Sequence, residues 1–177
     1  MEEIEVPTEH LHEHIKEKAE ESGGGWSMYA AVSTAIMAVF AALGSLMAGH
    51  HSNEALISQI KASDQWSYYQ AKGIKYEISH SIILQHQAAN VEPPAEIKEK
   101  QTKYKADQEA IMDKAHEAEK DSEFHLAKHV TLARSVTLFQ IAIAISAIAM
   151  LTKRSLLWYF SLALSAGGAC LFFMGVS

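Results

Sequence analysis

The chain has 177 residues, of which 49% are hydrophobic, and its formal net charge is −6. Its mean hydropathy, −0.03, is that of an ordinary soluble domain. No long segment is basic, which excludes a protein that binds nucleic acid through a positively charged surface, and a single cysteine, Cys170, excludes a disulfide framework and a disulfide partner.

The first segment, residues 1–25, carries the whole net charge of the chain. It holds eight acidic residues and two lysines, and it ends in the glycine-rich sequence Ser22–Gly25. We expect a solvated, mobile acidic tail. His10, His12 and His14 alternate with other residues and offer a metal-binding alternative, which rests on composition alone.

Residues 26–49 form a run of 24 residues without a charge. A membrane-spanning helix needs about 20 apolar residues, so we predict a first transmembrane helix here. The alternative of a signal peptide fits poorly, because the preceding flank is acidic and the run exceeds the usual apolar region of such peptides. Small residues recur every four positions, a spacing that lets helices pack closely in lipid. We therefore predict packing between copies of the chain through Ala31, Ala35, Ala38, Ala42, Ser45 and Gly49.

Residues 50–134 hold thirteen acidic and eleven basic residues, and one strong break interrupts them, at 90–94. Pro93 and Pro94 oppose helix there. The segments on either side, His50–Ala88 and Ala95–Ala133, are each 39 residues long, or about 58 Å as helix. The pattern predicts a long extramembrane antiparallel helical hairpin, coiled-coil-like, whose arms continue into the neighbouring spans without a break.

The two arms of this hairpin differ in their apolar pattern. On the second arm, a seven-residue repeat predicts a partly polar seam. Its residues are Ile97, Gln101, Tyr104, Gln108, Ile111, Ala115, Ala118, Ser122, His125, His129 and Leu132. On the first arm, the apolar stripe that we expect to face the second arm comprises Leu56, Ile60, Ser67, Ala71, Ile74, Ile78 and Ile82.

Three large aromatic residues, Trp66, Tyr68 and Tyr69, lie within four positions of the first arm. They point in different directions around a helix, so a single helix–helix contact cannot bury them all. We expect them to contact other copies of the chain, with packing over the chain's own Lys72 as the alternative.

Histidine and acidic residues gather where the hairpin should meet the membrane. Asp121, His125 and His129 share one helix face, a spacing suited to a shared divalent metal or to proton binding. The hairpin register should bring this face near the start of the first arm. The candidate ligands there are His50, His51 and Glu54. Histidines that bond to backbone or lipid headgroups are the more common outcome, and the spacing lacks the glutamate of zinc proteases.

Two further uncharged runs, residues 135–152 and 155–176, are separated only by Lys153 and Arg154. We predict a second and a third transmembrane helix joined by a tight turn. The basic turn favours a cytoplasmic N-terminus and a hairpin outside the cytoplasm. Lys120, Lys128 and Arg134 on the other side nearly balance this preference.

The stretch from Ala48 to Lys75, AGHHSNEALISQIKASDQWSYYQAKGIK, and the segment EVPTEHLHEHI at Glu5–Ile15 resemble a family of small bacterial membrane proteins catalogued as domain of unknown function 4337. The most specific similarity lies in Ser63-Asp64-Gln65-Trp66 and Tyr69-Gln70-Ala71-Lys72. The resemblance covers almost the whole chain. It implies a multi-pass protein of the bacterial inner membrane and implies no reaction.

These features together predict an all-α, three-span, homo-oligomeric membrane protein with a structural or scaffolding role and no catalysis or cofactor. No motif of a nucleophile, phosphate loop or catalytic triad appears. Its expected partners are membrane lipid and other copies of itself. A channel-like oligomer is the first alternative, since the spans hold no ionisable side chain for coupled transport but do hold Gln140, Ser146, Ser161 and Ser165. A metal- or pH-responsive protein is the second.

Overall fold

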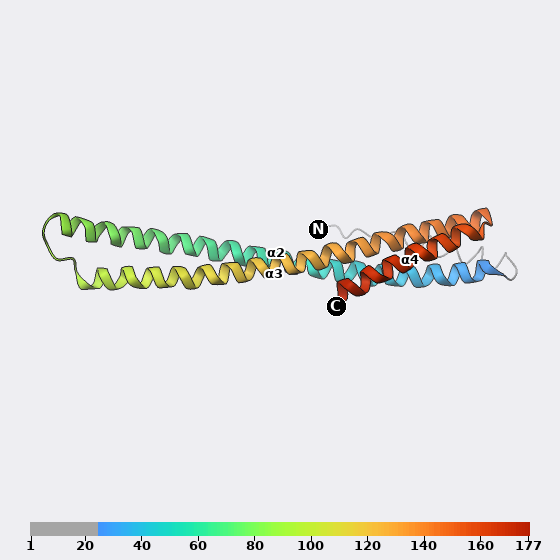
Figure 1. Cartoon of the computed structure of the whole chain (residues 1–177), viewed down its shortest axis with the longest axis horizontal. Helices are drawn as coiled ribbons and strands as arrows, with labels where there is room; N and C mark the ends of the chain where they lie inside the picture. The colour runs from blue at the N-terminus through green and yellow to red at the C-terminus, as the bar shows by residue number, and fades with distance from the viewer. Residues whose placement is uncertain (1–24) are drawn as a thin grey trace. The chain divides into compact units, whose positions relative to one another are not determined.

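The computed structural model describes residues 25–177, which form three α-helices and no strand (Figure 1). The helices are α2 (Trp26–Ala88, 63 residues), α3 (Ala95–Thr152, 58 residues) and α4 (Ser155–Val176, 22 residues). The all-helical prediction is confirmed, and α2 and α3 each run unbroken from apolar into charged sequence, as expected. The predicted acidic tail, with His10, His12 and His14, lies outside the described residues.

The C-terminal ends of α2 and α3 are capped in the same way. Asn90 and Lys153 adopt left-handed backbone angles, with φ of 54° and 55°. The backbone N–H of the next residue, Val91 or Arg154, donates to the carbonyl five positions earlier, at 2.9 and 3.1 Å. This is the Schellman pattern, which satisfies helix-terminal carbonyls and turns the chain. The chain therefore breaks at the proline turn and at the basic turn.

The helices contribute to two compact units. The apolar unit comprises the described residues 25–51 and 127–177, and the charged unit comprises Ser52–Leu126. Each of the three helices includes a segment that is long and apolar enough to cross a membrane.

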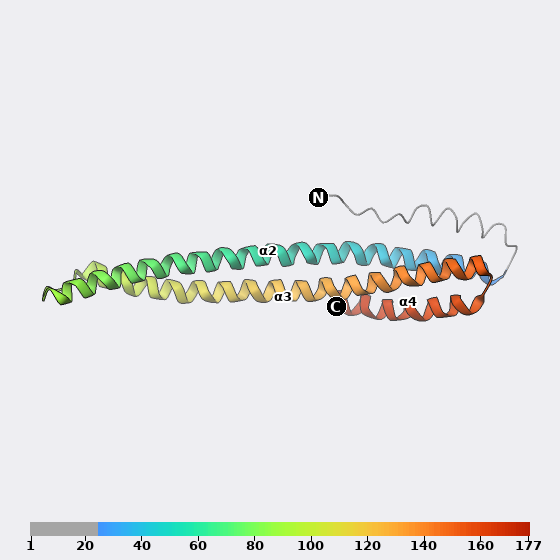
Figure 2. The same cartoon turned by 90° about the horizontal axis from the view of Figure 1, so that it is seen from above.

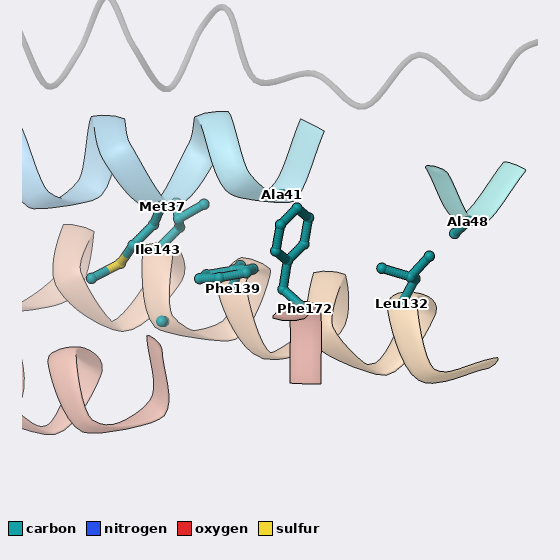
Figure 3. Close-up of a cluster of buried hydrophobic side chains, with 8 residues drawn as sticks. Met37, Ala41, Ala48, Leu132, Phe139, Ile143 and Phe172 are labelled. Atoms are coloured by element: carbon teal, nitrogen blue, oxygen red, sulfur yellow. The ribbon is translucent and has the colours of Figure 1, made fainter. Parts of the chain in front are cut away.

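In the apolar unit, the buried residues of α2 alternate in spacing between four and three positions. They are Ala30, Thr34, Met37, Ala41, Gly44 and Ala48. Phe139 from α3 and Phe172 from α4 turn toward this row (Figure 3). Phe40 lies 5.9 Å from the ring centroid of Phe139 and 5.6 Å from that of Phe172. Small residues on α2 thus leave room for rings from two other helices.

The helices of the apolar unit approach each other closely at glycines. A Cβ atom added to Gly44 would lie 2.9 Å from Val136, and one added to Gly175 would lie 2.7 Å from Leu132. The hydroxyl of Ser135 on α3 donates to the carbonyl of Gly168 on α4 at 2.8 Å. A hydroxyl can reach a backbone carbonyl of another helix only where no side chain separates the two, which is what glycine provides.

In the charged unit, α2 and α3 lie side by side (Figures 1 and 2), and the contacts pair them in opposite chain order. The hydroxyl of Ser122 donates to the carbonyl of Ala55 at 2.9 Å, and the side chain of Gln101 lies 3.1 Å from Nδ1 of His80. The seven-residue seam predicted on α3 is confirmed, since its residues are all buried or half-buried.

The apolar stripe predicted on α2 in this unit is wrong. Six of its seven residues, Leu56, Ile60, Ser67, Ala71, Ile74 and Ile78, are exposed, and only Ile82 is half-buried. The buried residues of α2 in this unit are Ala55, Ser58, Ala62, Ser79 and Ile83, so four of the five are alanine or serine. Small residues face α3 because the two backbones approach within hydrogen-bonding reach of a serine side chain.

Candidate functional site

The six predicted metal ligands lie in both units and do not form a ligand group. Among residues 25–177, no set of three histidine, cysteine or acidic side chains is placed to hold a metal ion. In the apolar unit, Nδ1 of His129 donates to the carbonyl of Ala48 at 2.8 Å, and the rings of His50 and His51 lie 5.5 Å apart. The bond from His129 to Ala48 is the backbone contact that we gave as the alternative.

The other three predicted ligands, Asp121, His125 and Glu54, lie in the charged unit. The ring of His125 lies 5.5 Å from that of Phe124, Asp121 is exposed, and Glu54 is half-buried. A hairpin centred on the turn at 90–94 predicts Glu54 opposite His129, whereas His129 contacts Ala48, six positions earlier on α2.

Glu119 is the centre of one polar cluster in the charged unit. Its Oε1 accepts a hydrogen bond from Nε1 of Trp66 at 2.7 Å, and its Oε2 lies 3.0 Å from Nδ1 of His116. The rings of Tyr69 and His116 meet the Trp66 ring edge to face, at 5.5 and 5.2 Å. Two hydrogen bonds lower the pKa of the Glu119 carboxyl, and the one from Trp66 has a larger effect than the one from His116.

Lys72 is the centre of a second cluster. Its Nζ lies 2.7 Å from Oδ2 of Asp107 and sits over the rings of Tyr68 and Tyr104, at 5.3 and 5.4 Å from their centroids. The hydrogen bond between Lys72 and Asp107 raises the pKa of the ammonium and lowers that of the carboxyl. Such an arrangement orders the side chains and joins the two helices through charge and cation–π attraction.

The aromatic residues assigned to contacts between copies therefore have partners within one chain. Trp66 and Tyr69 are half-buried in the Glu119 cluster, and Tyr68 packs beneath Lys72, as in the alternative given above. The small residues predicted for packing between copies differ in their burial. Ala31 and Ala38 are half-buried, whereas Ala35, Ala42, Ser45 and Gly49 are exposed.

The surface of α3 in the charged unit carries an open hollow. Its lining residues are Asp113, His116, Glu117, Glu119, Lys120 and Glu123. All six belong to a single helix, so the hollow is a shallow groove between surface side chains. An enclosed ligand site would draw its walls from several elements.

Within the apolar unit, the hydroxyl groups form hydrogen bonds and one amide side chain stands apart. Thr34 and Ser146 lie 2.7 Å apart, and Ser161 donates to the carbonyl of Trp158 at 2.8 Å. Gln140, by contrast, is exposed between exposed Thr137 and Ile141 on α3. Sequence reasoning grouped Gln140 with the serines as candidates for a polar path, because nothing in one sequence separates inward from outward positions.

Residues 26–177 match the model of a known protein family. The family model described as Domain of unknown function (DUF4337) matches residues 26–177. No curated protein and no solved structure matches the chain.

Proposed function

The chain belongs to the family described as Domain of unknown function (DUF4337), and from that premise we propose that it is a membrane-anchored, homo-oligomeric helical scaffold. In this proposal the three apolar segments cross the membrane, and the charged unit is an antiparallel helical hairpin in water. The role is to hold the charged unit of several copies together at one membrane surface.

The exposed amide of Gln140 is the observation that carries the homo-oligomer. A glutamine side chain facing lipid would leave two N–H donors and a carbonyl without partners in hydrocarbon. Threonine at the neighbouring exposed position avoids this cost, because the Thr137 hydroxyl donates to the carbonyl of Ala133 on its own helix. Glutamine amides commonly satisfy themselves across helices in membranes. A second copy of the chain supplies such a partner.

Anchoring in the membrane is supported by the surface of the apolar unit. Large apolar residues such as Leu46 and Leu156 are among the most exposed residues of this unit. This is expected for a surface that contacts lipid in place of water. The buried hydroxyls of Thr34, Ser135 and Ser146 all have hydrogen-bond partners in the unit. Such an interior suits a bilayer, where an unpaired polar group costs several kcal/mol.

The basic turn at Lys153 and Arg154 gives the proposal its orientation. Basic residues in short loops remain on the cytoplasmic side. We therefore place this turn and the N-terminus in the cytoplasm and the charged unit on the other side. A cysteine introduced at exposed Ala106 should react with an impermeant reagent in intact cells, in a Cys170→Ser background. Reaction only after lysis would reverse this orientation.

A channel-like assembly is the second candidate, and Gln140 favours it as well. If several copies surround an axis, an exposed amide on α3 could line a water-filled path in place of an interface between helices. Purified protein in liposomes distinguishes the two functions. A scaffold leaves the ion permeability of the liposomes unchanged, whereas a channel increases it.

Native mass spectrometry in mild detergent tests the assembly itself. We expect a defined oligomer for the natural chain and a loss of subunits for Gln140→Leu, which replaces the amide with an apolar side chain of similar size. Thr137→Val is the matched control, since it changes an exposed polar group whose hydroxyl is satisfied on its own helix. A monomer at all concentrations would overturn the scaffold, and an equal loss in both variants would remove the role of Gln140.

A further inference from the structure

We propose that the outer face of α2 in the charged unit binds the same face of a second copy, in parallel and in register. This inference rests on the proposed scaffold and names the surface that joins its copies. Four isoleucines form the surface, which we call the isoleucine stripe. They are Ile57, Ile60, Ile74 and Ile78, with exposed fractions of 44%, 53%, 62% and 56%.

The stripe has the spacing of a helix-packing surface. Ile57 and Ile78 are three heptads apart, and Ile60 and Ile74 are two heptads apart, so the four occupy two heptad positions over about 32 Å of helix. The seam toward α3 uses the same repeat at different positions, since Ala55 and Ala62 are seven residues apart. The α2 helix thus carries two faces with coiled-coil spacing. Within one chain, α3 covers the alanine face and leaves the isoleucine stripe exposed.

The distribution of side-chain size supports a partner on the second face. The buried residues of α2 in this unit are four alanines or serines and one isoleucine, Ile83, whereas the exposed face holds the four isoleucines of the stripe. A helix with one face in water normally shows the reverse pattern, with its large apolar residues on the buried face. Large apolar residues exposed together on one face mark an interaction site.

The two helices of the charged unit also differ in how many charged residues they carry. The α2 segment, residues 52–88, has three acidic residues and three lysines, whereas the α3 segment, residues 95–126, has nine acidic residues and six lysines. Depletion of charge is typical of the core of an interface. The structure therefore assigns α2 to the interior of an assembly and α3 to its solvated exterior.

A second copy fits the stripe because the stripe is complementary to itself. Copies anchored in one membrane with the same topology run parallel, so each isoleucine meets its counterpart. Asp64 and Ser67 interrupt the stripe near its middle, on the same outer face. A polar residue at a core position fixes the register of a coiled coil, at some cost in stability. Here a shifted register would set Asp64 against isoleucine.

The residues that flank the stripe are compatible with a parallel pair. Lys61 and Lys75 lie along one edge, and Leu56, Gln70 and Glu77 lie along the other. In a parallel coiled coil, one edge of a helix meets the opposite edge of its partner. The lysine edge of one copy then faces a neutral or acidic edge of the next, so like charges do not meet along the edges, whereas Asp64 within the stripe meets Asp64 of the second copy.

Disulfide trapping of the full-length chain in membranes tests the stripe. Cys170→Ser removes the single natural thiol, which is exposed. Ile60→Cys and Ile74→Cys are then introduced separately into that background, and Ala106→Cys and Ala110→Cys on the exposed face of α3 are the matched controls. A disulfide needs Cα atoms within about 7 Å. We expect oxidation to link the stripe cysteines into covalent dimers and to leave the controls monomeric.

A second pair of variants separates loss of assembly from loss of folding. Ile74→Asn should lose subunits in native mass spectrometry while its helical circular dichroism is retained, and Ile74→Leu should keep both. An oligomer that links at Ala106 or Ala110 but not at the stripe would overturn this inference and leave the scaffold standing. A chain that is monomeric in both measurements would overturn the scaffold as well.

Discussion

The side-chain oxygens of Thr34 on α2 and Ser146 on α3 lie 2.7 Å apart, although 112 positions separate the two residues in the chain. The Thr34 hydroxyl already donates to the carbonyl of Ala30 at 2.7 Å. Its oxygen must therefore accept the hydrogen of Ser146, so the two hydroxyls form a short directed chain. Both residues are fully buried in the apolar unit.

This pair should stabilise the apolar unit measurably. Thr34→Val and Ser146→Ala are each expected to lower the free energy of unfolding, and their double-mutant cycle should give a coupling of about 0.6–2 kcal/mol, as for hydrogen bonds between membrane helices. Unfolding in mild detergent by titration with a denaturing detergent measures this energy. Additive single effects would show that the hydroxyls are not coupled, and Thr137→Val is the exposed control.

Gly44 and Gly49 on α2 should respond in opposite ways to alanine. A Cβ atom on Gly44 would lie 2.9 Å from Cγ2 of Val136, a stiff β-branched side chain, whereas one on Gly49 meets nothing within 4 Å. We expect Gly44→Ala to destabilise the unit by about 1–3 kcal/mol through overpacking. Gly49→Ala should be neutral or stabilise by up to about 1 kcal/mol through helix propensity. Equal effects in thermal unfolding would contradict this close approach of α2 and α3.

The Lys72–Asp107 pair should make the stability of the charged unit depend on pH. The pKa of the Asp107 carboxyl is lowered in the folded chain, chiefly by its hydrogen bond with Lys72. The stabilisation is therefore complete above about pH 4, the ordinary carboxyl pKa, and is lost as pH falls through the lowered value. The raised pKa of Lys72 sets the other limit, since stabilisation present below about pH 10.4 is lost as pH rises further.

The measurement is thermal unfolding followed by circular dichroism at a series of pH values. Asp107→Asn should flatten the acid limb of the profile. Asp113→Asn, a change at an exposed carboxylate of the same helix, should leave it in place. A natural chain whose stability is unchanged between pH 6 and pH 2 would count against the ion pair.

Trp66 should control the protonation of Glu119 through its indole N–H. Trp66→Phe keeps an aromatic ring for Tyr69 and His116 to pack against but removes the donor 2.7 Å from Oε1. The pKa of Glu119 should therefore rise toward its ordinary value of about 4.3. Carboxyl chemical shifts in an NMR titration report this pKa. Tyr69→Phe is the control and should not shift it, because Tyr69 meets Trp66 through its ring.

The residues that could be predicted from the sequence are those whose effect is local. Pro93 and Pro94 end a helix wherever they occur, and the heptad on α3 from Ile97 to Leu132 carried enough apolar residues to identify its buried side. On α2 the same reasoning chose the wrong face, because isoleucine was given more weight than alanine. Four of the five buried residues there are alanine or serine, and small residues contribute close approach of two backbones, which a single sequence does not encode as hydrophobicity.

The candidate site also combines features that are local in the sequence with contacts between distant positions. Asp121, His125 and His129 share a helix face in the sequence, yet a metal site also needs side chains brought together in space, and among residues 25–177 no three histidine, cysteine or acidic side chains are placed to hold a metal ion. The hydrogen bond from Trp66 to Glu119 spans 53 positions, and the ion pair of Lys72 and Asp107 spans 35. Neither pairing has a local spacing signal.

The near-zero mean hydropathy and the net charge of −6 describe a chain in which apolar and charged segments alternate. The sequence by itself determined where these segments begin and end, because about 20 uncharged residues and a double proline act locally. Only the tertiary structure decided which side of α2 faces α3, since helix approach depends on the shapes of two surfaces at once. That choice buries the alanines and leaves the isoleucine stripe exposed.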